Sequence, residues 1–352
     1  MQFERKHKII VASTQYPFYG GAATNAYALI KFFRSYGYRT AGLFIEDARN
    51  PVNPDNLEGI FSIPTYDAPV NRLAEYVYRY LGGTPNVMLG KNYQAPITLK
   101  RMFPNEASGY LVAGCPQMAE LAKQGISLQR SLKENKSLIN AEENQCIKIT
   151  NVIIPNNPIG HKILMLNYNN DKRICSPVDT SFAMNNYNIE KKPFKDRKYD
   201  ISFVCSRFDR EVKNSELAIK LMNDTLFRKS KKIVIGKMAN AFNGTENLTI
   251  EGFINDSNRI LSILNDTKVL ICTSYYDASP NVVKEAIICG CNVLMSKNCG
   301  WYEKYPKEFV CEDVYEIEEW KDKLNYLINN DVEFSYDIEK EKEKILKGLY
   351  LL

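Results

Sequence analysis

The chain has few histidines and no long apolar segment, and each scarcity excludes a class of site. Its 352 residues include 2 histidines and 2 tryptophans, and nowhere does an uninterrupted apolar run reach 18 residues. The histidines, His7 and His161, lie far apart in the sequence and belong to no cluster of metal-ligand type. A helix that spans a bilayer needs about 20 mostly apolar residues. An Asp-x-Asp metal motif is also absent. We therefore expect no metal site and no membrane-spanning helix.

Cysteine is present but without a disulfide pattern. The 9 cysteines are odd in number and irregularly spaced, as in proteins of a reducing compartment. Cys289 and Cys291 form only a Cys-x-Cys at a helix-to-strand junction, where packing is the favoured role. The N-terminus passes from charged residues directly into a short strand and has no signal-peptide pattern. These features predict a cytoplasmic protein.

The charge is modest and gives no strong partner signal. The net charge is +5, and the basic clusters 191–198 and 228–232 contain only one aromatic residue, Phe194, which favours solvated surface over nucleic-acid binding. Residues 72–81, RLAEYVYRYL, place Leu73, Tyr76, Val77 and Tyr80 at helical spacing. Packing of this helix on its own domain is the commoner arrangement. Peripheral binding to an anionic membrane is the alternative, since two arginines accompany the aromatic residues.

Short apolar strands alternate with helical stretches through the first half of the chain. This pattern implies a parallel sheet with helices on both faces. The predicted strands are 9–12, 40–45, 87–89, 109–113 and 152–154, and the predicted helices are 22–36, 68–81 and 116–124.

The alternation begins again after a polar, Asn- and Lys-rich passage. Strands are predicted at 200–205, 232–235, 247–250, 268–272 and 291–295, with helices between them. The chain should therefore form an N-terminal Rossmann-like domain over 1–178, a linker over 179–199 and a second Rossmann-like domain over 200–335. The last segment, 336–352, should be a helix that crosses back to the first domain. Ligands of such folds bind at the carboxyl ends of the strands, here in a cleft between the domains.

The most informative stretch is 277–303, DASPNVVKEAIICGCNVLMSKNCGWYE. Ser279 is a good N-cap and Pro280 a good first helical residue. The backbone N–H groups around Asn281 and Val282 should then be open to a phosphate. Glu285 lies about a turn and a half further on, where it could accept hydrogen bonds from hydroxyls of the same ligand.

Three further segments lie after predicted strands. Gly20 and Gly21 would let a ligand approach the backbone before a helix. Arg207 and Lys213 could hold a diphosphate, although surface pairing with neighbouring acids is equally compatible with the residues. Gly252, Phe253 and Ile254 form a turn whose backbone could contact a nucleobase. Each segment alone is a weak signal.

Together these segments resemble the retaining GT-B glycosyltransferases of family four, also called glycosyl transferases group 1, and in particular members of polysaccharide biosynthesis. The resemblance extends over nearly the whole chain and is strongest from 200 to 303. It implies two doubly wound Rossmann-like domains and catalysis by Arg207, Lys213, Asp277 and Glu285. The family's pair of glutamates separated by seven residues corresponds here to Asp277 and Glu285.

The resemblance also implies a reaction. The donor would be a UDP-sugar or GDP-sugar, and the acceptor a glycan or a lipid-linked sugar. No cofactor or metal is implied, because Arg207, Lys213 and the helix end would stabilise the departing diphosphate. The expected activity is a metal-independent retaining hexosyltransferase. The expected donor contacts are Gly20, Gly21, Gly252, Phe253, Ile254, Ser279, Pro280, Asn281 and Val282.

Two departures keep a second function open. The first acid of the pair is Asp277 and not glutamate, and neither histidine matches the one that many members carry in the N-terminal domain. The corresponding stretch reads Gly114-Cys115-Pro116. A catalytically impaired relative that acts as a binding or regulatory subunit is therefore the alternative. A two-domain solute-binding protein would share the architecture but normally requires export.

Overall fold

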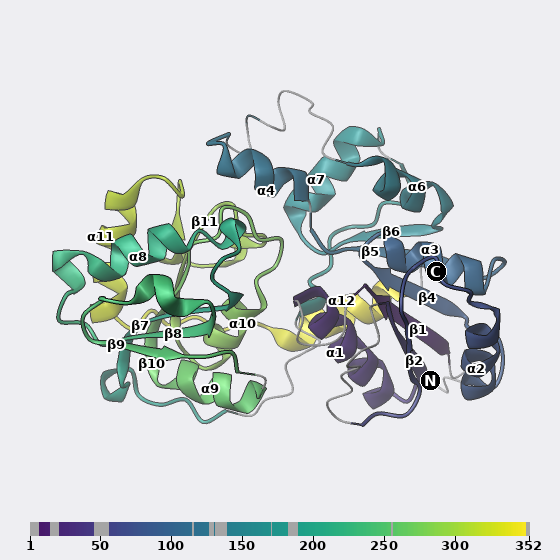
Figure 1. Ribbon diagram of the computed structural model, residues 1–352, viewed down its shortest axis with the longest axis horizontal. Coiled ribbons are helices and arrows are strands. Elements are labelled where there is room, and N and C mark those ends of the chain that lie inside the picture. The colour runs from purple at the N-terminus through teal and green to yellow at the C-terminus, as the bar shows by residue number, and fades with distance from the viewer. Residues whose placement is uncertain are drawn as a thin grey trace. The chain divides into compact units, whose positions relative to one another are not determined.

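The computed structural model describes residues 7–14, 21–45, 56–114, 116–126, 130, 139–169, 171–181, 189–254 and 256–349 (Figure 1). Gly20 and most of the predicted glycine loop therefore lie outside the described residues. The chain divides into two compact units. The first comprises Met1–Cys115, Asn135–Asn185 and Ile338–Leu352, and the second comprises Pro116–Glu134 and Asn186–Asp337. Both are α/β units built around a parallel sheet.

The described part of the first unit contains a six-stranded parallel sheet in the order β3-β2-β1-β4-β5-β6. All five strands predicted for this half are confirmed, and β3 is an addition. Its sequence, IFSI, is short and largely half-buried, so neither a long apolar run nor clean alternation marks it. The bounds are β1 Lys8–Ser13, β2 Arg39–Ile45, β3 Ile60–Ile63, β4 Val87–Lys91, β5 Ser108–Val112 and β6 Val152–Pro155.

Helices cover both faces of this sheet, as strands buried on two sides require. Side chains of α1 and α12 pack with alternate residues of β1 and β4 on one face, while α2 and α3 pack on the other. The final helix α12 lies within the segment 336–352 that was predicted to be helical, and its Ile345 lies in the core of the first unit. The bounds are α1 Gly21–Ser35, α2 Asn71–Leu81, α3 Gln94–Met102, α6 Ala141–Ile149, α7 Pro158–Asn167 and α12 Ile338–Leu349.

The helix α2 packs on its own unit through part of its surface. Val77 and Leu81 are buried in the core, and Leu73 and Tyr80 pack against it. Tyr76 and Tyr78 point away from the core and are 50% and 49% exposed. The packing interpretation is therefore confirmed for the apolar stripe, with the exception of Tyr76. Among the described residues, no helix is long and apolar enough to cross a membrane.

The described part of the second unit also contains a six-stranded parallel sheet, in the order β12-β11-β10-β7-β8-β9. The five predicted strands are present, and the two-residue β12 was missed because it is too short to show a pattern. The bounds are β7 Tyr199–Arg207, β8 Lys232–Lys237, β9 Leu248–Glu251, β10 Thr267–Cys272, β11 Asn292–Ser296 and β12 Val310–Cys311; the helices are α8 Ser215–Asn223, α9 Ser257–Asn265, α10 Asn281–Ile288 and α11 Ile317–Asn329.

One helix from the first half of the sequence belongs to the second unit. The helix α4, Pro116–Lys123, precedes the residues that return to the first sheet. Lys123 forms an ion pair with Glu211, and the Tyr315 hydroxyl donates a hydrogen bond to the carbonyl of Ala122. The sequence assigned these residues to the N-terminal domain because a local helical pattern does not show which sheet the helix joins.

Candidate functional site

The loop that follows β7 is fixed to the end of β10 by backbone contacts. A single turn of 3-10 helix, η3 (Glu211–Lys213), leads into α8. The Thr273 hydroxyl lies 3.0 Å from the carbonyl oxygens of both Lys213 and Asn214, and the Tyr275 N–H donates to the carbonyl of Val212 at 2.9 Å. These contacts hold Lys213 at the carboxyl edge of the second sheet, where parallel α/β folds bind ligands.

Lys213 forms an ion pair with Asp277. The Lys213 Nζ lies 2.6 Å from Asp277 Oδ2, and the two side chains are 20% and 18% exposed. Burial lowers the pKa of Lys213, but the nearby Asp277 carboxylate outweighs this effect, so the pKa lies above its ordinary value. Lys213 is therefore a cation at neutral pH. The sequence placed both residues at the site without predicting that they would pair.

Backbone hydrogen bonds set the position of Asp277. Its N–H donates to the carbonyl of Asn298 at 3.2 Å, and its own carbonyl accepts from the N–H of Gly300 at 2.7 Å. The Asp277 Oδ1 accepts from the N–H of Ser279 at 3.2 Å. The loop after β11 and the loop before α10 therefore form one rigid support for the carboxylate.

The start of α10 differs from the prediction by one residue. Pro280, not Ser279, occupies the N-cap position, with φ −66° and ψ 112°, and no side chain caps the helix. The Ser279 hydroxyl, one residue before the cap position, accepts a hydrogen bond from Lys284 Nζ. Asn281 and Val282 are then the first two residues of α10, so their backbone lies at its N-terminus. The helix end that should attract phosphate thus begins one residue later than expected.

Glu285 carries a desolvated carboxyl group in the middle of α10. Its side chain is half-buried, and no described residue donates a hydrogen bond to it or forms an ion pair with it. Burial raises the pKa of Glu285 to about 7. A carboxylate held in this way lacks the compensation that buried charges usually have. Hydroxyl groups of a ligand would supply it.

Arg207 is not joined to Lys213 and Asp277 in this structure. It is the last residue of β7, and its guanidinium binds Asp209 at 3.0 and 2.5 Å with 58% of its side chain exposed. For Arg207 the structure therefore shows the surface ion pair with a neighbouring acid, Asp209. For Lys213 the surface-pairing interpretation is wrong, because Lys213 pairs with Asp277 while Glu211 pairs with Lys123.

The turn after β9, residues 252–254, contacts residues other than those around Lys213 and Asp277. Phe253 lies under Lys237, whose Nζ is 4.8 Å from the ring centre, and Ile254 packs against a small apolar cluster around Tyr199. Gly252 has open space where a side chain would stand. No contact between described residues links this turn to Lys213 or Asp277. Of the glycine loop, Gly21 is described as the first residue of α1.

Both histidines belong to the first unit. His7 precedes β1, and His161 is on α7, the helix capped by the Asn157 side chain through the N–H of Gly160 at 2.8 Å. Burial lowers the pKa of His161, so it is neutral at pH 7. Cys115 lies outside the described residues, and the eight described cysteines are free.

Two buried lysines at the carboxyl edges of the sheets were not predicted from the sequence. Lys284, on α10, is 2% exposed and contacts Ser279. Lys91, at the end of β4, is 3% exposed and donates to Asn25 of α1 and, at 3.2 Å, to the Thr180 hydroxyl. A lysine in a sequence is usually taken to lie on the surface. Only the position of Lys91 at the end of a strand, and that of Lys284 next to Glu285, could have indicated a role in the site.

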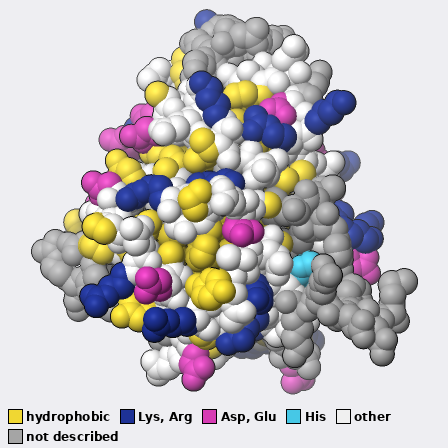
Figure 2. All heavy atoms as spheres, turned by 90° about the vertical axis from the view of Figure 1, so that its right-hand side faces the viewer, with side chains coloured by type: hydrophobic (Ala, Val, Ile, Leu, Met, Phe, Trp, Pro, Cys, Tyr) yellow, Lys and Arg dark blue, Asp and Glu magenta, His cyan; other side chains and the backbone are white. Residues whose placement is uncertain are grey.

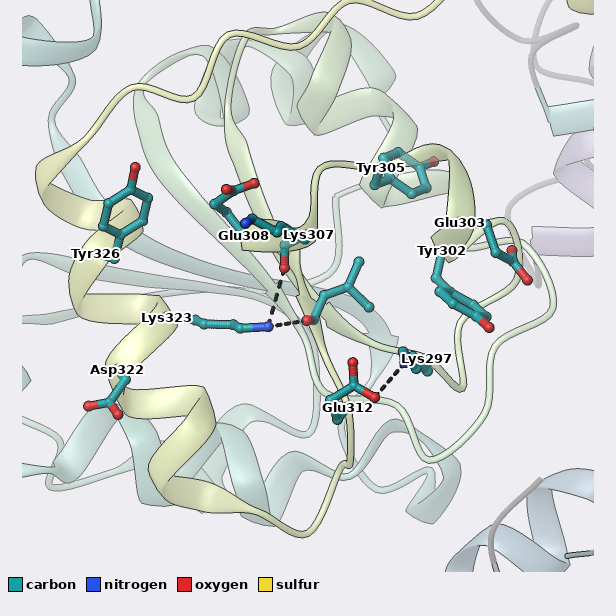
Figure 3. Close-up of a pocket in the computed structure, with 11 residues that line it drawn as sticks. Lys297, Tyr302, Glu303, Tyr305, Lys307, Glu308, Glu312, Asp322, Lys323 and Tyr326 are labelled. Atoms are coloured by element: carbon teal, nitrogen blue, oxygen red, sulfur yellow. Dashed lines mark hydrogen bonds and ion pairs between the residues drawn. The ribbon is translucent and has the colours of Figure 1, made fainter. Parts of the chain in front are cut away.

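A cavity of about 790 Å³ lies between α11 and the edge strand β12 (Figure 3). Lys297 and Glu312 form an ion pair at one side of it, and Lys323 Nζ donates to the carbonyls of Lys307 and Val310 across its floor. Acidic and basic groups are mixed around the cavity. The hydrogen bonds from Lys323 already satisfy the carbonyl groups of Lys307 and Val310 at its floor. The lining residues are Lys297, Tyr302, Glu303, Tyr305, Lys307, Glu308, Val310, Glu312, Asp322, Lys323 and Tyr326.

One family model matches part of the chain. Residues 185–345 match the family model described as glycosyl transferases group 1. No curated protein sequence matches the chain significantly.

Several solved structures are similar over 98% of the chain. HepE from Anabaena, in complex with UDP and glucose, is 14% identical with a TM-score of 0.67 over 98% of this chain and 100% of that one. Sucrose-phosphate synthase from Thermosynechococcus elongatus is 14% identical with a TM-score of 0.64 and is covered over 95%. The catalytic domain of starch synthase IV from Arabidopsis thaliana, bound to ADP and acarbose, is 12% identical with a TM-score of 0.61 and is covered over 98%. Residues 185–345, most of which lie in the second unit, are thus similar to the glycosyl transferases group 1 family, and the two parallel sheets have the GT-B fold of these structures.

Proposed function

We propose that this protein transfers a sugar from a nucleoside-diphosphate sugar to a glycan or a lipid-linked acceptor. The observation that carries the proposal is the grouping of Lys213, Asp277 and Ser279 at the start of α10, within the segment that matches the family. Nucleoside diphosphates bound to HepE and to starch synthase IV support the same ligand class.

The donor would bind with its diphosphate at the N-terminus of α10. Backbone N–H groups at a helix N-terminus and the helix dipole favour an anion there, and Lys213 adds a full positive charge. Arg207 would join them by leaving Asp209, a contact between exposed groups that contributes little stability. Glu285 would accept hydrogen bonds from the ribose hydroxyls. The backbone of 252–254 would contact the base, which would be that of UDP or GDP.

The reaction would be driven by stabilisation of the leaving group. As the bond between the sugar and the diphosphate breaks, negative charge grows on the phosphate oxygens next to Lys213 and the helix end. Charges already in place for that state lower the barrier. The acceptor hydroxyl would attack from the face that the diphosphate leaves, and a phosphate oxygen would take its proton, which retains the anomeric configuration. This chemistry requires no metal, and Asp277 would face the donor sugar.

The acceptor is assigned to the first unit, and peripheral membrane binding would bring a lipid-linked acceptor to it. Tyr76 and Tyr78 of α2 are exposed beside the exposed Arg72 and Arg79. Figure 2, which views the side of the molecule that carries α2, shows basic, acidic and apolar side chains mixed over this face. Aromatic and basic groups together suit the interface of an anionic bilayer.

The test is turnover with a panel of UDP- and GDP-sugars, with released nucleoside diphosphate as the readout and NMR of the product for its anomeric form. We expect turnover in the parent and its loss in Asp277→Asn. Asp277 is shorter than the family's glutamate and is tied to Lys213, which favours the binding-subunit alternative. A parent that binds a donor without transferring it to any acceptor would support that alternative.

A further inference from the structure

Two cysteines of the second unit lie with their thiol groups in contact. Cys272 is the last residue of β10 and Cys299 lies in the loop after β11, and they are 5% and 0% exposed. Their sulfur atoms are 3.9 Å apart, and among the eight described cysteines only this pair shares a hydrogen bond. A disulfide bond holds two sulfur atoms at about 2.05 Å, so an approach of about 2 Å would allow the bond to form.

Each of these cysteines is next to backbone that positions the candidate site. The Thr273 hydroxyl, one residue after Cys272, lies 3.0 Å from the carbonyl oxygen of Lys213. The residues on either side of Cys299 bond to Asp277: the carbonyl before it accepts from the Asp277 N–H at 3.2 Å, and the N–H after it donates to the Asp277 carbonyl at 2.7 Å. The two thiols therefore connect the two backbone segments that hold the Lys213–Asp277 ion pair.

The surroundings of Cys272 favour its thiolate form. The thiolate is the nucleophile in cysteine oxidation, and neighbouring donors and cations stabilise it. The hydrogen bond from the Cys299 thiol holds the pKa of Cys272 below its ordinary value, and Lys213 acts in the same direction, against burial and the Asp277 carboxylate. Cys205 of the same unit is half-buried, yet burial raises its pKa to about 11. The more exposed of these thiols therefore carries less thiolate at neutral pH.

We propose that Cys272 and Cys299 form a reversible disulfide bond when the protein meets hydrogen peroxide, and that this bond weakens nucleotide binding by displacing the backbone that holds Lys213 and Asp277. The formation of the bond does not depend on the proposed function, whereas its effect on binding rests on that function. Because both thiols are buried, the oxidant must be small, and hydrogen peroxide is little larger than water. In reducing compartments such disulfides are usually transient and redox-sensing.

The reaction balances with one peroxide molecule for each disulfide. The Cys272 thiolate attacks one peroxide oxygen, the O–O bond breaks, and a sulfenic acid and one water molecule form. The Cys299 sulfur then attacks the Cys272 sulfur, the S–O bond breaks, and a second water molecule leaves. The two thiols together lose two hydrogen atoms with their electrons, which reduce the peroxide. Dithiothreitol restores both thiols by exchange and is itself oxidised to a disulfide.

The first experiment is peptide mapping of the folded protein after treatment with hydrogen peroxide and alkylation of the remaining thiols. Trypsin, which cuts after lysine, releases Cys272 in peptide 269–284 and Cys299 in peptide 298–304, and neither peptide contains another cysteine. We expect mass spectrometry to find these two peptides joined, and to find them separate after dithiothreitol. A disulfide with another partner, or a map in which both thiols stay unpaired, would overturn the proposal.

The second experiment is calorimetric titration with UDP and GDP before and after peroxide treatment. For the nucleotide that the reduced parent binds, we expect at least about tenfold weaker binding after oxidation, restored by dithiothreitol. Cys272→Ala and Cys299→Ala should each bind with the same affinity before and after treatment, and having two such variants guards against one that does not fold. Cys205→Ala is the matched control, and it should respond to peroxide as the parent does.

The two experiments distinguish the ways in which the account can fail. A parent that forms the disulfide and binds its nucleotide unchanged would refute the effect on the site. A loss of binding in peroxide-treated Cys272→Ala or Cys299→Ala would assign the effect to another group, which also contradicts the proposal. If the reduced parent binds neither nucleotide, the proposed function fails, and the peptide map still decides whether the disulfide forms.

Discussion

Lys213 and Asp277 show how far single residues could be predicted here. Their positions after a strand and before a helix placed both at the carboxyl edge of one sheet, and they lie 2.6 Å apart. Arg207, predicted by the same argument, is paired with Asp209. The sequence cannot decide between these outcomes because an exposed arginine next to an aspartate forms a local pair at little cost. Lys284 was missed because its burial depends on how α10 sits on the sheet.

At the residue scale, Glu285 should make nucleotide binding depend on pH. Burial raises its pKa to about 7, and ligand hydroxyls that donate to the carboxylate favour the ionised form. Affinity for the nucleoside diphosphate should therefore rise as pH increases from about 6 to 8. In Glu285→Gln this part of the pH dependence should vanish, while the part caused by the phosphate remains. Calorimetric titration at several pH values measures both, and identical profiles would exclude the assigned role.

The same group affects stability in the opposite direction. Its pKa is raised in the folded state, so the folded protein holds the proton more tightly than the unfolded chain does. Stability gained from this carboxyl group is therefore present below about pH 4 and is lost as pH rises towards 7. Without ligand at pH 8, Glu285→Gln should melt at a higher temperature than the parent. A lower melting temperature would show that the carboxylate has a stabilising partner.

Elements were predicted best where an apolar run and a glycine or proline boundary coincide. The strands β4 and β11, which follow Pro85 and Gly290, have this form, and both were found. The short edge strands β3 and β12 carry too few buried residues to show a period. The start of α10 was misplaced by one residue because Ser279 and Pro280 are both common at helix starts. In the structure Pro280 takes the cap position, and the Ser279 hydroxyl contacts Lys284.

The strand pair β7 and β8 offers a test of how an element positions the site. Their register shifts between Val204 and Arg207, and Gly236 of β8 has a φ of 153° beside this irregularity. A Cβ atom at Gly236 would lie 2.0 Å from the carbonyl oxygen of Cys205. Because that atom belongs to the backbone, it cannot move aside easily.

We expect Gly236→Ala to destabilise the second unit by about 2 kcal/mol or more and to weaken nucleotide binding, since β7 leads directly to Lys213. Chemical denaturation and calorimetry measure the two effects. Gly244→Ala is the control, because its φ of 91° is also positive but nothing lies within 4 Å of the added atom. Equal stability of Gly236→Ala and the parent would show that the strands adjust freely.

At the scale of the whole molecule, sequence order and structural unit do not coincide. The helix α12 ends the chain but belongs to the first unit, and α4 comes from the first half but belongs to the second. The first exchange was predicted from the order of the elements along the chain, as a final helix that crosses back to the first domain. The second was not, because its evidence consists of contacts far apart in sequence, such as the pair Lys123 and Glu211.

The place of α12 predicts an effect confined to one unit. Ile345 is 5% exposed in the core formed with α1 and the first sheet. Ile345→Ala should destabilise the first unit by about 2–4 kcal/mol. Hydrogen exchange followed by mass spectrometry should show faster exchange in β1, β4 and α1, with the strands of the second unit unchanged. Faster exchange in both units would mean that they unfold together, and no change would mean that α12 is not part of the core.

The central claim is that Lys213 and the start of α10 form a binding site for a nucleoside diphosphate. Calorimetric titration with UDP and GDP of the parent, Lys213→Ala and Lys220→Ala tests it most directly, because Lys220 is a cation of the same unit whose exposed side chain pairs with Glu216 on α8. The account predicts that the parent and Lys220→Ala bind one of the two nucleotides equally well, and that Lys213→Ala binds it at least about tenfold more weakly. Equal binding by all three proteins would contradict it.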